Sequence, residues 1–521
     1  MRMNGCRLWG VLTLGSPVLL HAQNPLSVAM AEASITATRL LHTISVISDD
    51  STLGRATPSP GLDKAARFVA EQFRQFGLTP GGDDGTYLQH YPLLLRQIDT
   101  AQSTVSFQGP VPATLQPGTA INVLRLSSIP EHALTGPVVV FAGPLDPSHP
   151  FDGAKVRDAW VGLVVSTKGG ALPVPPWLVD AVRAAGALGV VFLSDRPDAS
   201  WAAHLSYVAH GDLVEGGIHE RPDTTRPIGF VELRDDEAAP LLGLDIQALR
   251  ASGGRSARPV PGVSMTYRVV ETQRQTATAA NVVAILEGRD PDLRHEYVVL
   301  SGHLDHLGTP GAHEGCFAQG ADSICNGADD DASGAGTVVA LAQAFSRLSP
   351  HPRRSVIFIT VSGEERGLWG SRYYVAHGTA PITQIVADIQ SDMVGRNSRD
   401  TVAAVGLDDS DLGATLIGVS KAHPELHMTP VSMVPLPALW SAQRVYRGSD
   451  HYEFARHGVP ALFFFSGLHD DYHRVSDEVA KIDGEKTARI ARLEFHLALT
   501  IANAPARPAW NEASYRAIVG Q

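Results

Sequence analysis

Apolar positions after residue 280 fall into two alternating patterns, which predict strands and helices in turn. Continuous apolar runs predict buried strands at 282–286, 297–300, 355–361, 385–389 and 461–465. Apolar residues spaced three and four apart predict helices at 336–348, 368–377, 412–422 and 486–502. This alternation predicts an α/β fold with a mixed central sheet and helices on both of its faces.

The chain before residue 280 has a different pattern of predicted elements. Residues 62–76 predict an amphipathic helix, and strands are predicted at 87–95 and 103–107. Between 116 and 262, prolines and glycines are frequent and short strands alternate with loops, which predicts a smaller, β-rich α/β domain. Pro259–Gly262 is predicted to end it, because two prolines and a glycine interrupt regular structure. The predicted organisation is a main domain from 24–115 and 263–521, with 116–262 inserted.

The first 23 residues have the pattern of an export signal. Arg2 and Arg7 precede an apolar run from Leu8 to Leu20, and the small residue Ala22 follows. We therefore expect residues 1–23 to be a cleaved signal peptide and the mature chain to be secreted or periplasmic. No later segment is apolar enough to predict a membrane anchor.

The charge and the cysteine content limit the partners of the chain and the chemistry of one loop. The 521-residue chain has a formal net charge of −12 and no basic stripe, which argues against a nucleic-acid partner. Cys316 and Cys325 are close together in one predicted loop, and export would place them in an oxidising compartment. A disulfide is the favoured interpretation; two free thiols or two metal ligands are the alternatives.

Polar residues follow the predicted strands at the points where they end. His303 and Asp305 follow the strand that ends at 300, and Glu364 and Glu365 follow the next one along the sequence. Two further strands precede Asp392 and His473, and three adjacent aspartates, 329–331, precede a helix. Because open α/β sheets gather ligand sites at the carboxyl ends of strands, we expect one cluster. A solvated acidic turn that caps the helix is the alternative for the aspartates alone.

The residue types in this cluster suit a pair of divalent ions. Zinc binds neutral imidazole and carboxylate oxygen, and two ions about 3.5–4 Å apart need a bridging carboxylate. Asp330, the central aspartate, is the expected bridge. The expected remaining ligands are His303 and Asp392 for one ion, and Glu365 and His473 for the other.

Three more residues have expected roles beside the ions. Asp305 is placed to accept the other N–H of the His303 imidazole. Glu364 has no metal to bind, so it is the expected general base and acid. Tyr472 can donate a hydrogen bond to a developing oxyanion, or its ring can simply pack in the loop.

These residues carry a resemblance to a known family. The chain resembles the secreted zinc exopeptidases related to bacterial leucyl aminopeptidases and glutamate carboxypeptidase II. The matching segments are Gly302–Asp305, Gly327–Gly334, Gly363–Glu365, Ser391–Met393 and Tyr472–His473. The resemblance implies two Zn²⁺ ions per chain held by the five ligands above, Glu364 as general base, peptide substrates, and a cis peptide bond after Asp330. Residues 116–262 resemble the protease-associated domain often inserted in this family, most closely at Ala184–Val190.

The expected activity is that of an aminopeptidase, and three alternatives stay open. A carboxypeptidase or dipeptidase on the same site would use Arg444 and Arg447 to bind a substrate carboxylate. A glutaminyl cyclase with a single zinc and a non-enzymatic binding protein are the others. His451 is expected either to contact substrate or to pack beneath the loop. His306, His313 and His469 are expected to be neighbours of the ligands rather than ligands.

Overall fold

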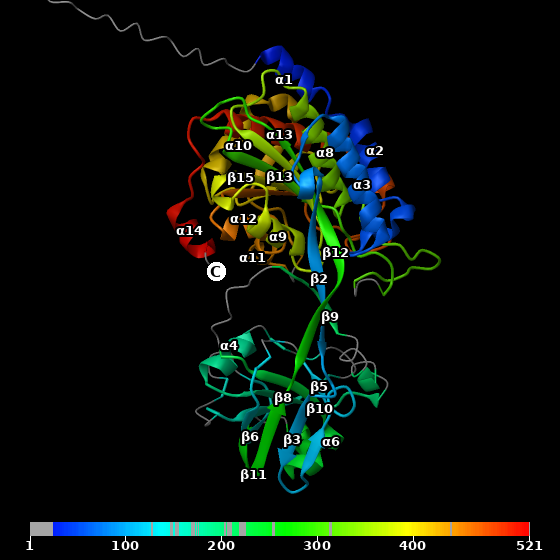
Figure 1. Ribbon diagram of the computed structural model, residues 1–521, viewed down its shortest axis with the longest axis vertical. Coiled ribbons are helices and arrows are strands. Elements are labelled where there is room, and N and C mark those ends of the chain that lie inside the picture. Colours follow the sequence, from blue (N-terminus) through cyan, green and yellow to red (C-terminus); the bar gives the residue numbers. More distant parts are fainter. Residues whose placement is uncertain are drawn as a thin grey trace, which may run out of the picture. The chain divides into compact units, whose positions relative to one another are not determined.

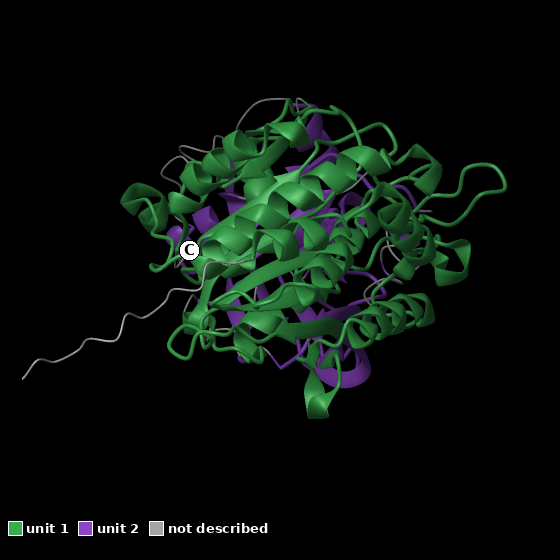
Figure 2. Cartoon of the chain, turned by 90° about the horizontal axis from the view of Figure 1, so that it is seen from above, with its two compact units in different colours: residues 1–90, 280–521 green, residues 91–279 purple. Residues whose placement is uncertain are grey.

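The computed structural model describes residues 24–519 except for short gaps, which are 125, 127–128, 146–149, 152–155, 168–171, 173, 176, 199, 203–204, 206–210, 218–225, 253–255, 312–314 and 438–439. The expected signal peptide and His313 lie outside the described residues. The chain divides into two compact units (Figure 2). The first comprises residues up to 90 and from 280 onward, and the second comprises Tyr91–Ala279.

The first unit is built on a mixed sheet. The sheet includes β12 (Glu271–Leu286), β13 (Tyr297–His303), β14 (Ser355–Val361), β15 (Ile385–Ser391), β16 (Thr401–Val405), β17 (Thr429–Val431) and β18 (Ala461–Phe465), which lie in the order β17-β16-β18-β15-β13-β14-β12. The four strands β18, β15, β13 and β14 are parallel to one another. Strand β12 is antiparallel to β14, and β16 is antiparallel to β18. Because the four central strands are parallel, their carboxyl ends meet at one edge of the sheet.

Helices cover both faces of this sheet, as the sequence predicts (Figure 1). On one face, α2 (Ala37–Ile47), α3 (Pro60–Gln75), α8 (Ala332–Ser346), α10 (Asp411–Ala422) and α13 (Gly484–Asn503) share a core with Val298 and Leu300. On the other face, α9 (Trp369–His377) and α12 (His451–Arg456) pack with Val299. Successive residues of β13 thus point to opposite faces, and both faces are buried, which explains the continuous apolar runs.

Other elements of this unit are short or lie at its ends. They are α1 (Pro25–Glu32), β1 (Thr79–Pro80), α11 (Ala442–Tyr446) and α14 (Glu512–Ile518). The described residues include no helix with both the length and the apolar character needed to cross a membrane. The predicted disulfide between Cys316 and Cys325 is confirmed. Its two sulfurs are buried in a small cluster with Leu307 and Val475.

The second unit is a smaller β-rich α/β body. Its main sheet has the order β4-β3-β11-β6-β7-β8-β10-β5, and the inner strands β6, β7, β8 and β10 are parallel. The strands are β3 (Thr104–Gln108), β4 (Ala113–Leu115), β5 (Asn122–Val123), β6 (Leu134–Ala142), β7 (Trp160–Val165), β8 (Gly189–Ser194), β10 (Gly229–Arg234) and β11 (Ser256–Arg268). The helices α4 (Trp177–Ala184), α6 (Asp235–Leu242) and α7 (Ile246–Ala251) accompany them, and β9 (Asp212–Glu215) pairs with β2 (Leu88–Ile98).

The limits of this unit differ from the predicted limits 116–262. Strand β3 lies before residue 116 but pairs with β11, so it belongs to the second unit. The prolines at 259 and 261 do not end an element: they lie inside β11, whose register against β6 shifts between Pro259 and Ser264. A bulge of this kind accommodates residues that lack a backbone N–H. The expectation that Pro259–Gly262 interrupt regular structure is therefore wrong.

Candidate metal centre

The predicted site residues converge at the carboxyl edge of the central sheet. His303 is the last residue of β13, Asp392 directly follows β15, and Glu365 follows β14 by four residues. Asp330 lies just before α8, and His473 lies in the loop after β18. The side chains of the first four are no more than 10% exposed, whereas that of His473 is 33% exposed. The cluster is thus buried on one side and open on the other.

Asp330 lies between two histidines, with one oxygen turned to each. Its Oδ1 is 3.1 Å from Nε2 of His303, and its Oδ2 is 3.3 Å from Nε2 of His473. Nε2 of His303 is also 3.6 Å from Oδ1 of Asp392, and Nε2 of His473 is 3.4 Å from Oε2 of Glu365. The five residues therefore form two groups that share Asp330, which is the arrangement the sequence predicts.

These separations suit metal coordination. Two ligand atoms bound at 2.0–2.1 Å to one tetrahedral zinc lie about 3.3–3.4 Å apart. The four distances range from 3.1 to 3.6 Å around that value. Oδ1 of Asp392 is buried and has no hydrogen-bond partner in the described part of the chain, which leaves it available for a cation. The donor set of imidazoles and carboxylates therefore fits a pair of zinc ions.

The electrostatics of the cluster also favour cations. Burial lowers the pKa of His473, but its contacts with Asp330 and Glu365 outweigh burial and raise that pKa to about 10. Burial likewise lowers the pKa of His303, and the nearby carboxylates, led by Asp392, raise it well above its usual range. Protons thus bind strongly at the positions that a metal would take.

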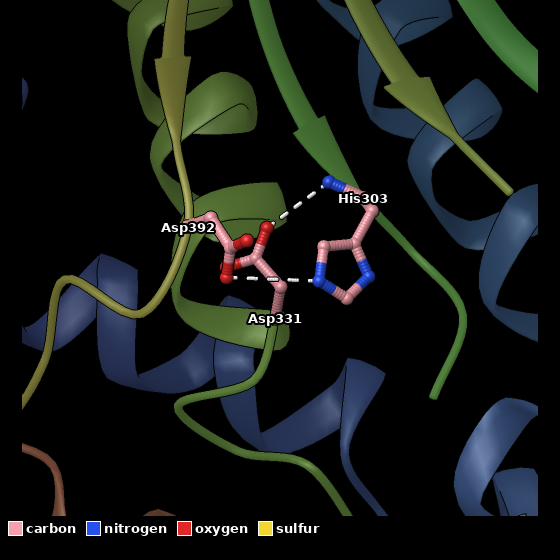
Figure 3. A group of neighbouring side chains, drawn as sticks. All are labelled: His303, Asp331 and Asp392. Atoms are coloured by element: carbon pink, nitrogen blue, oxygen red, sulfur yellow. Dashed lines mark hydrogen bonds and ion pairs between the residues drawn. The ribbon is translucent and has the colours of Figure 1, made fainter. Parts of the chain in front are cut away.

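The three consecutive aspartates have different partners; Figure 3 shows Asp331 beside His303 and Asp392. Oδ1 of Asp331 accepts the backbone N–H groups of Gly334 (2.7 Å) and Met393 (3.2 Å), and its Oδ2 accepts that of His303 (3.0 Å). A ligand atom of Asp331 is close enough to His303 and Asp392 for all three to reach one ion. Three N–H donors already satisfy its oxygens, however, and it caps α8. Asp331 is therefore better suited to holding the backbone than to binding a metal.

Asp329 is likewise engaged elsewhere. Its Oδ1 accepts the backbone N–H of Gly395 at 2.6 Å, and its Oδ2 is 3.2 Å from Nε2 of His469. His469 is thus a neighbour of the aspartate turn, as the sequence predicts. Of the three aspartates, only Asp330 turns both oxygens toward the histidines of the cluster. The peptide bond between Asp330 and Asp331 is cis, as the family resemblance implies.

Two residues that the sequence did not single out support this turn. The carboxylate of Asp477 accepts the backbone N–H groups of Asp329 (3.0 Å) and Asp330 (3.1 Å). The buried guanidinium of Arg55 donates to the backbone oxygens of Leu304, Asn326, Gly327 and Ile47 at 2.7–3.1 Å. Burial lowers the pKa of Arg55 to about 10, so the group stays charged at neutral pH. Arg55 therefore ties the loop after His303 to the aspartate turn.

Asp305 differs from its predicted role. Nδ1 of His303 lies 3.1 Å from the backbone oxygen of Asp305 but 3.7 Å from its carboxylate, which is too long for a hydrogen bond. The Asp305 carboxylate accepts instead from the Thr57 hydroxyl (2.8 Å) and the backbone N–H of Glu364 (3.2 Å). Its backbone thus orients the His303 ring, and its side chain positions the segment that carries Glu364.

Glu364 and Tyr472 line a cavity together with His303, Asp330 and Asp392. Burial raises the pKa of Glu364 well above its usual range, and the Glu365 carboxylate adds to this although His303 opposes it. A raised pKa suits a group that accepts and then returns a proton. The Tyr472 ring stacks on His473 at 3.8 Å, and burial raises its pKa, so its hydroxyl keeps its proton. Tyr472 therefore packs in the loop and also lies in the cavity as a donor.

The rest of the cavity wall is mostly apolar. Apolar side chains line it at Met393, Trp440, Val445, Phe463, Phe465 and Leu468. Ser449 also lines it, and its hydroxyl donates to Oδ2 of Asp392 at 2.8 Å. The His451 ring packs against Phe463 (4.9 Å) and Tyr446 (5.1 Å) and does not line the cavity. Of the two roles expected for His451, the structure favours packing.

The fold and this cluster define a class of protein: α/β domains that hold metal ions at the carboxyl edge of a mixed sheet. Residues 281–498 match the model of Peptidase family M28. The fold is similar to that of the aminopeptidase from Aneurinibacillus sp. strain AM-1, with a TM-score of 0.50 and 19% identity over 92% of this chain and 97% of that one.

Two proteins of similar sequence are described as probable zinc metalloproteases. A probable zinc metalloprotease of Pyricularia oryzae is 26% identical over 370 residues, which cover 61% of this chain and 69% of the relative. A probable zinc metalloprotease of Pyrenophora tritici-repentis is 26% identical over 267 residues, which cover 44% and 53%. The matched residues thus span about half the length of this second relative.

Proposed function

We propose that this chain is a zinc-dependent exopeptidase that removes N-terminal residues from peptides. The observation that carries the proposal is Asp330, whose two oxygens lie at ligand spacing from His303 and His473 beside the cavity that contains Glu364. The family match and the zinc metalloprotease relatives support a peptidase and zinc. The disulfide supports an exported protein, because such bonds persist in oxidising compartments.

The residues of the cavity have distinct parts in this reaction. Zinc, when bound, supplies a Lewis acid and lowers the pKa of a coordinated water. His303 and Asp392 would hold one ion, Glu365 and His473 the other, and Asp330 both. Glu364 takes a proton from the attacking water and returns it to the leaving amine. The Tyr472 hydroxyl donates a hydrogen bond to the oxygen of the scissile carbonyl as charge develops there.

The cavity walls favour an aminopeptidase over a carboxypeptidase. A carboxypeptidase needs a cation to bind the terminal carboxylate of its substrate. Arg444 and Arg447 do not line the cavity: Arg444 lies 4.2 Å from the Trp440 ring centroid, and Arg447 lies 6.0 Å from that of Tyr452. The cavity instead joins carboxylates, which can bind an N-terminal ammonium, to apolar walls, which suit an apolar side chain.

A substrate panel tests the proposal. The full chain with zinc should hydrolyse leucine and phenylalanine p-nitroanilides, and N-acetylation of the same substrates should abolish hydrolysis. Glu364→Gln should lower kcat by about 10²–10⁴-fold while zinc content is unchanged. Release of C-terminal residues from N-blocked peptides would favour the carboxypeptidase instead. A single bound zinc with cyclisation of N-terminal glutamine would favour the glutaminyl cyclase.

A further inference from the structure

A third imidazole, His306, lies against the cluster without an assigned role. Its side chain is fully buried, and its backbone N–H donates to the backbone oxygen of Arg55 at 3.2 Å. A Cβ atom on Gly327 would lie 2.5 Å from Cγ and Cδ2 of the His306 ring. The ring therefore packs directly against the backbone of the aspartate turn, and a glycine at 327 makes room for it.

The distances around Glu365 separate His306 from His473. Nδ1 of His306 is 2.7 Å from Oε1 of Glu365, whereas Nε2 of His473 is 3.4 Å from Oε2. A separation of 2.7 Å is that of a short hydrogen bond, and two ligands of one tetrahedral zinc lie about 3.3 Å apart. His473 thus has ligand spacing to Glu365, and His306 has hydrogen-bond spacing. Oε1 of Glu365 thus faces His306, and Oε2 faces His473.

We propose that His306 is a positioning residue that donates its Nδ1–H to Oε1 of Glu365 and so presents Oε2 to the zinc shared with His473. The role rests on the proposed function, because it needs a metal at that position. The Ser449 hydroxyl makes the corresponding contact on the other side of the cluster, where it donates to the outer oxygen of Asp392. Such outer contacts orient ligands and strengthen metal binding.

The contact of His306 with Asp330 is longer, at 3.7 Å between Nδ1 and Oδ2. Neither ring nitrogen of His306 forms a hydrogen bond of good angle in the described part of the chain, so the 2.7 Å contact of Nδ1 with Oε1 of Glu365 becomes one only when the ring is aligned with the carboxylate. The short contact with Glu365 therefore carries the role. Removing it frees the carboxylate to rotate, which should weaken one zinc position more than the other.

Zinc affinity in three variants tests the role. His306→Leu keeps a side chain of similar size without a donor, and His306→Asn keeps an N–H near the position of Nδ1. His496→Leu is the matched control, because it removes another histidine–glutamate contact, the 3.2 Å pair of the buried His496 with the partly exposed Glu32. The measurement is competition of the full chain with a chromophoric zinc chelator, with a melting curve of each zinc-free variant to establish that it folds.

We expect His306→Leu to weaken one of two zinc sites about 10–100-fold, and His306→Asn to restore that site to within a few-fold of wild type. His496→Leu should leave both affinities unchanged. Wild-type affinity in His306→Leu would overturn the role and leave the proposed function standing. Equal losses in His306→Asn and His306→Leu would overturn it as well, in favour of a direct ligand. A wild-type chain that binds no zinc would overturn the proposed function and this role together. If His306→Leu does not fold, the affinity of His306→Asn decides.

Discussion

The neighbouring substitutions Asp330→Asn and Asp331→Asn should have different effects on stability and on zinc binding. Asp331 accepts three backbone N–H bonds from three separate segments, at His303, Gly334 and Met393. A hydrogen bond to a charged group contributes about 1.5–3 kcal/mol, and asparagine keeps only one acceptor oxygen. Asp331→Asn should therefore cost about 2–4 kcal/mol, which corresponds to a fall in Tm of about 5–10 °C.

Asp330→Asn should act on zinc binding instead. Its carboxylate faces the two histidine groups, so asparagine would remove the ligand proposed to be shared by two zinc ions. Zinc at 100 times its Kd stabilises a folded protein by about 2.7 kcal/mol per site. The zinc-free wild type should therefore gain several degrees in Tm when zinc is added, and Asp330→Asn should lose this gain.

Thermal melting with and without zinc separates the two outcomes. Asp331→Asn should melt lower in both conditions and keep most of the zinc-dependent gain. Asp329→Asn is a suitable comparison, because Asp329 carries the same charge in the same turn and accepts from Gly395. Loss of the zinc-dependent gain in Asp331→Asn, or its retention in Asp330→Asn, would contradict these roles of the two aspartates.

Three further predictions concern pH, the disulfide and the pocket. Burial raises the pKa of Glu494 to about 8 from its usual 4.5, although the Ser391 hydroxyl opposes it. The folded chain then holds a proton that the unfolded chain releases between these pH values, so this group lowers the free energy of unfolding as pH rises from 4.5 to 8. Glu494→Gln should be more stable than wild type at pH 8.5, by up to about 5 kcal/mol in chemical denaturation, with little difference at pH 4.5. Joint replacement of Cys316 and Cys325 by serine should cost about 2–3 kcal/mol in chemical denaturation, and equal stability would contradict this. Trp440→Ala should lower kcat/KM about 10–100-fold for phenylalanine p-nitroanilide and less for the alanine substrate, whereas a uniform loss would exclude Trp440 from side-chain recognition.

The strands of the central sheet were predictable because both faces of the sheet are buried. Strand β14 is apolar throughout and matches its predicted range of 355–361. The helix predicted at 336–348 begins earlier, at Ala332, because Asp331 caps it and the small residues after the cap are all buried. The cap places the aspartate turn at the very start of α8, which the apolar pattern alone does not reveal.

The extent of the second unit was not predictable from local patterns. Strand β3 belongs to it only because Gln108 pairs with Ser264, more than 150 residues away. The prolines in β11 predicted a boundary because the sequence alone does not show the partner strands, and these decide whether a strand tolerates proline. The helices α1 and α2 were missed as well. Helix α2 buries Leu40 and Ile44 against the same core as α8, a contact that appears only in the folded chain.

The candidate ligands were predictable because each follows a strand or precedes a helix. The residues that support them were not, since their contacts are with backbone atoms far along the chain. Arg55 donates to carbonyl groups 249 and 271 positions away, and Asp477 accepts from the turn 147 positions before it. The partner of the His303 ring was predicted at the right residue, Asp305, but at its side chain instead of its backbone.

The central claim is that two zinc ions share Asp330. Metal analysis of purified full-length protein, loaded with zinc and dialysed, tests it most directly when Asp330→Asn is measured beside the wild type. The account predicts two zinc ions per wild-type chain and loss of both in the variant. Fewer than two ions in the wild type, or two ions retained by Asp330→Asn, would contradict it.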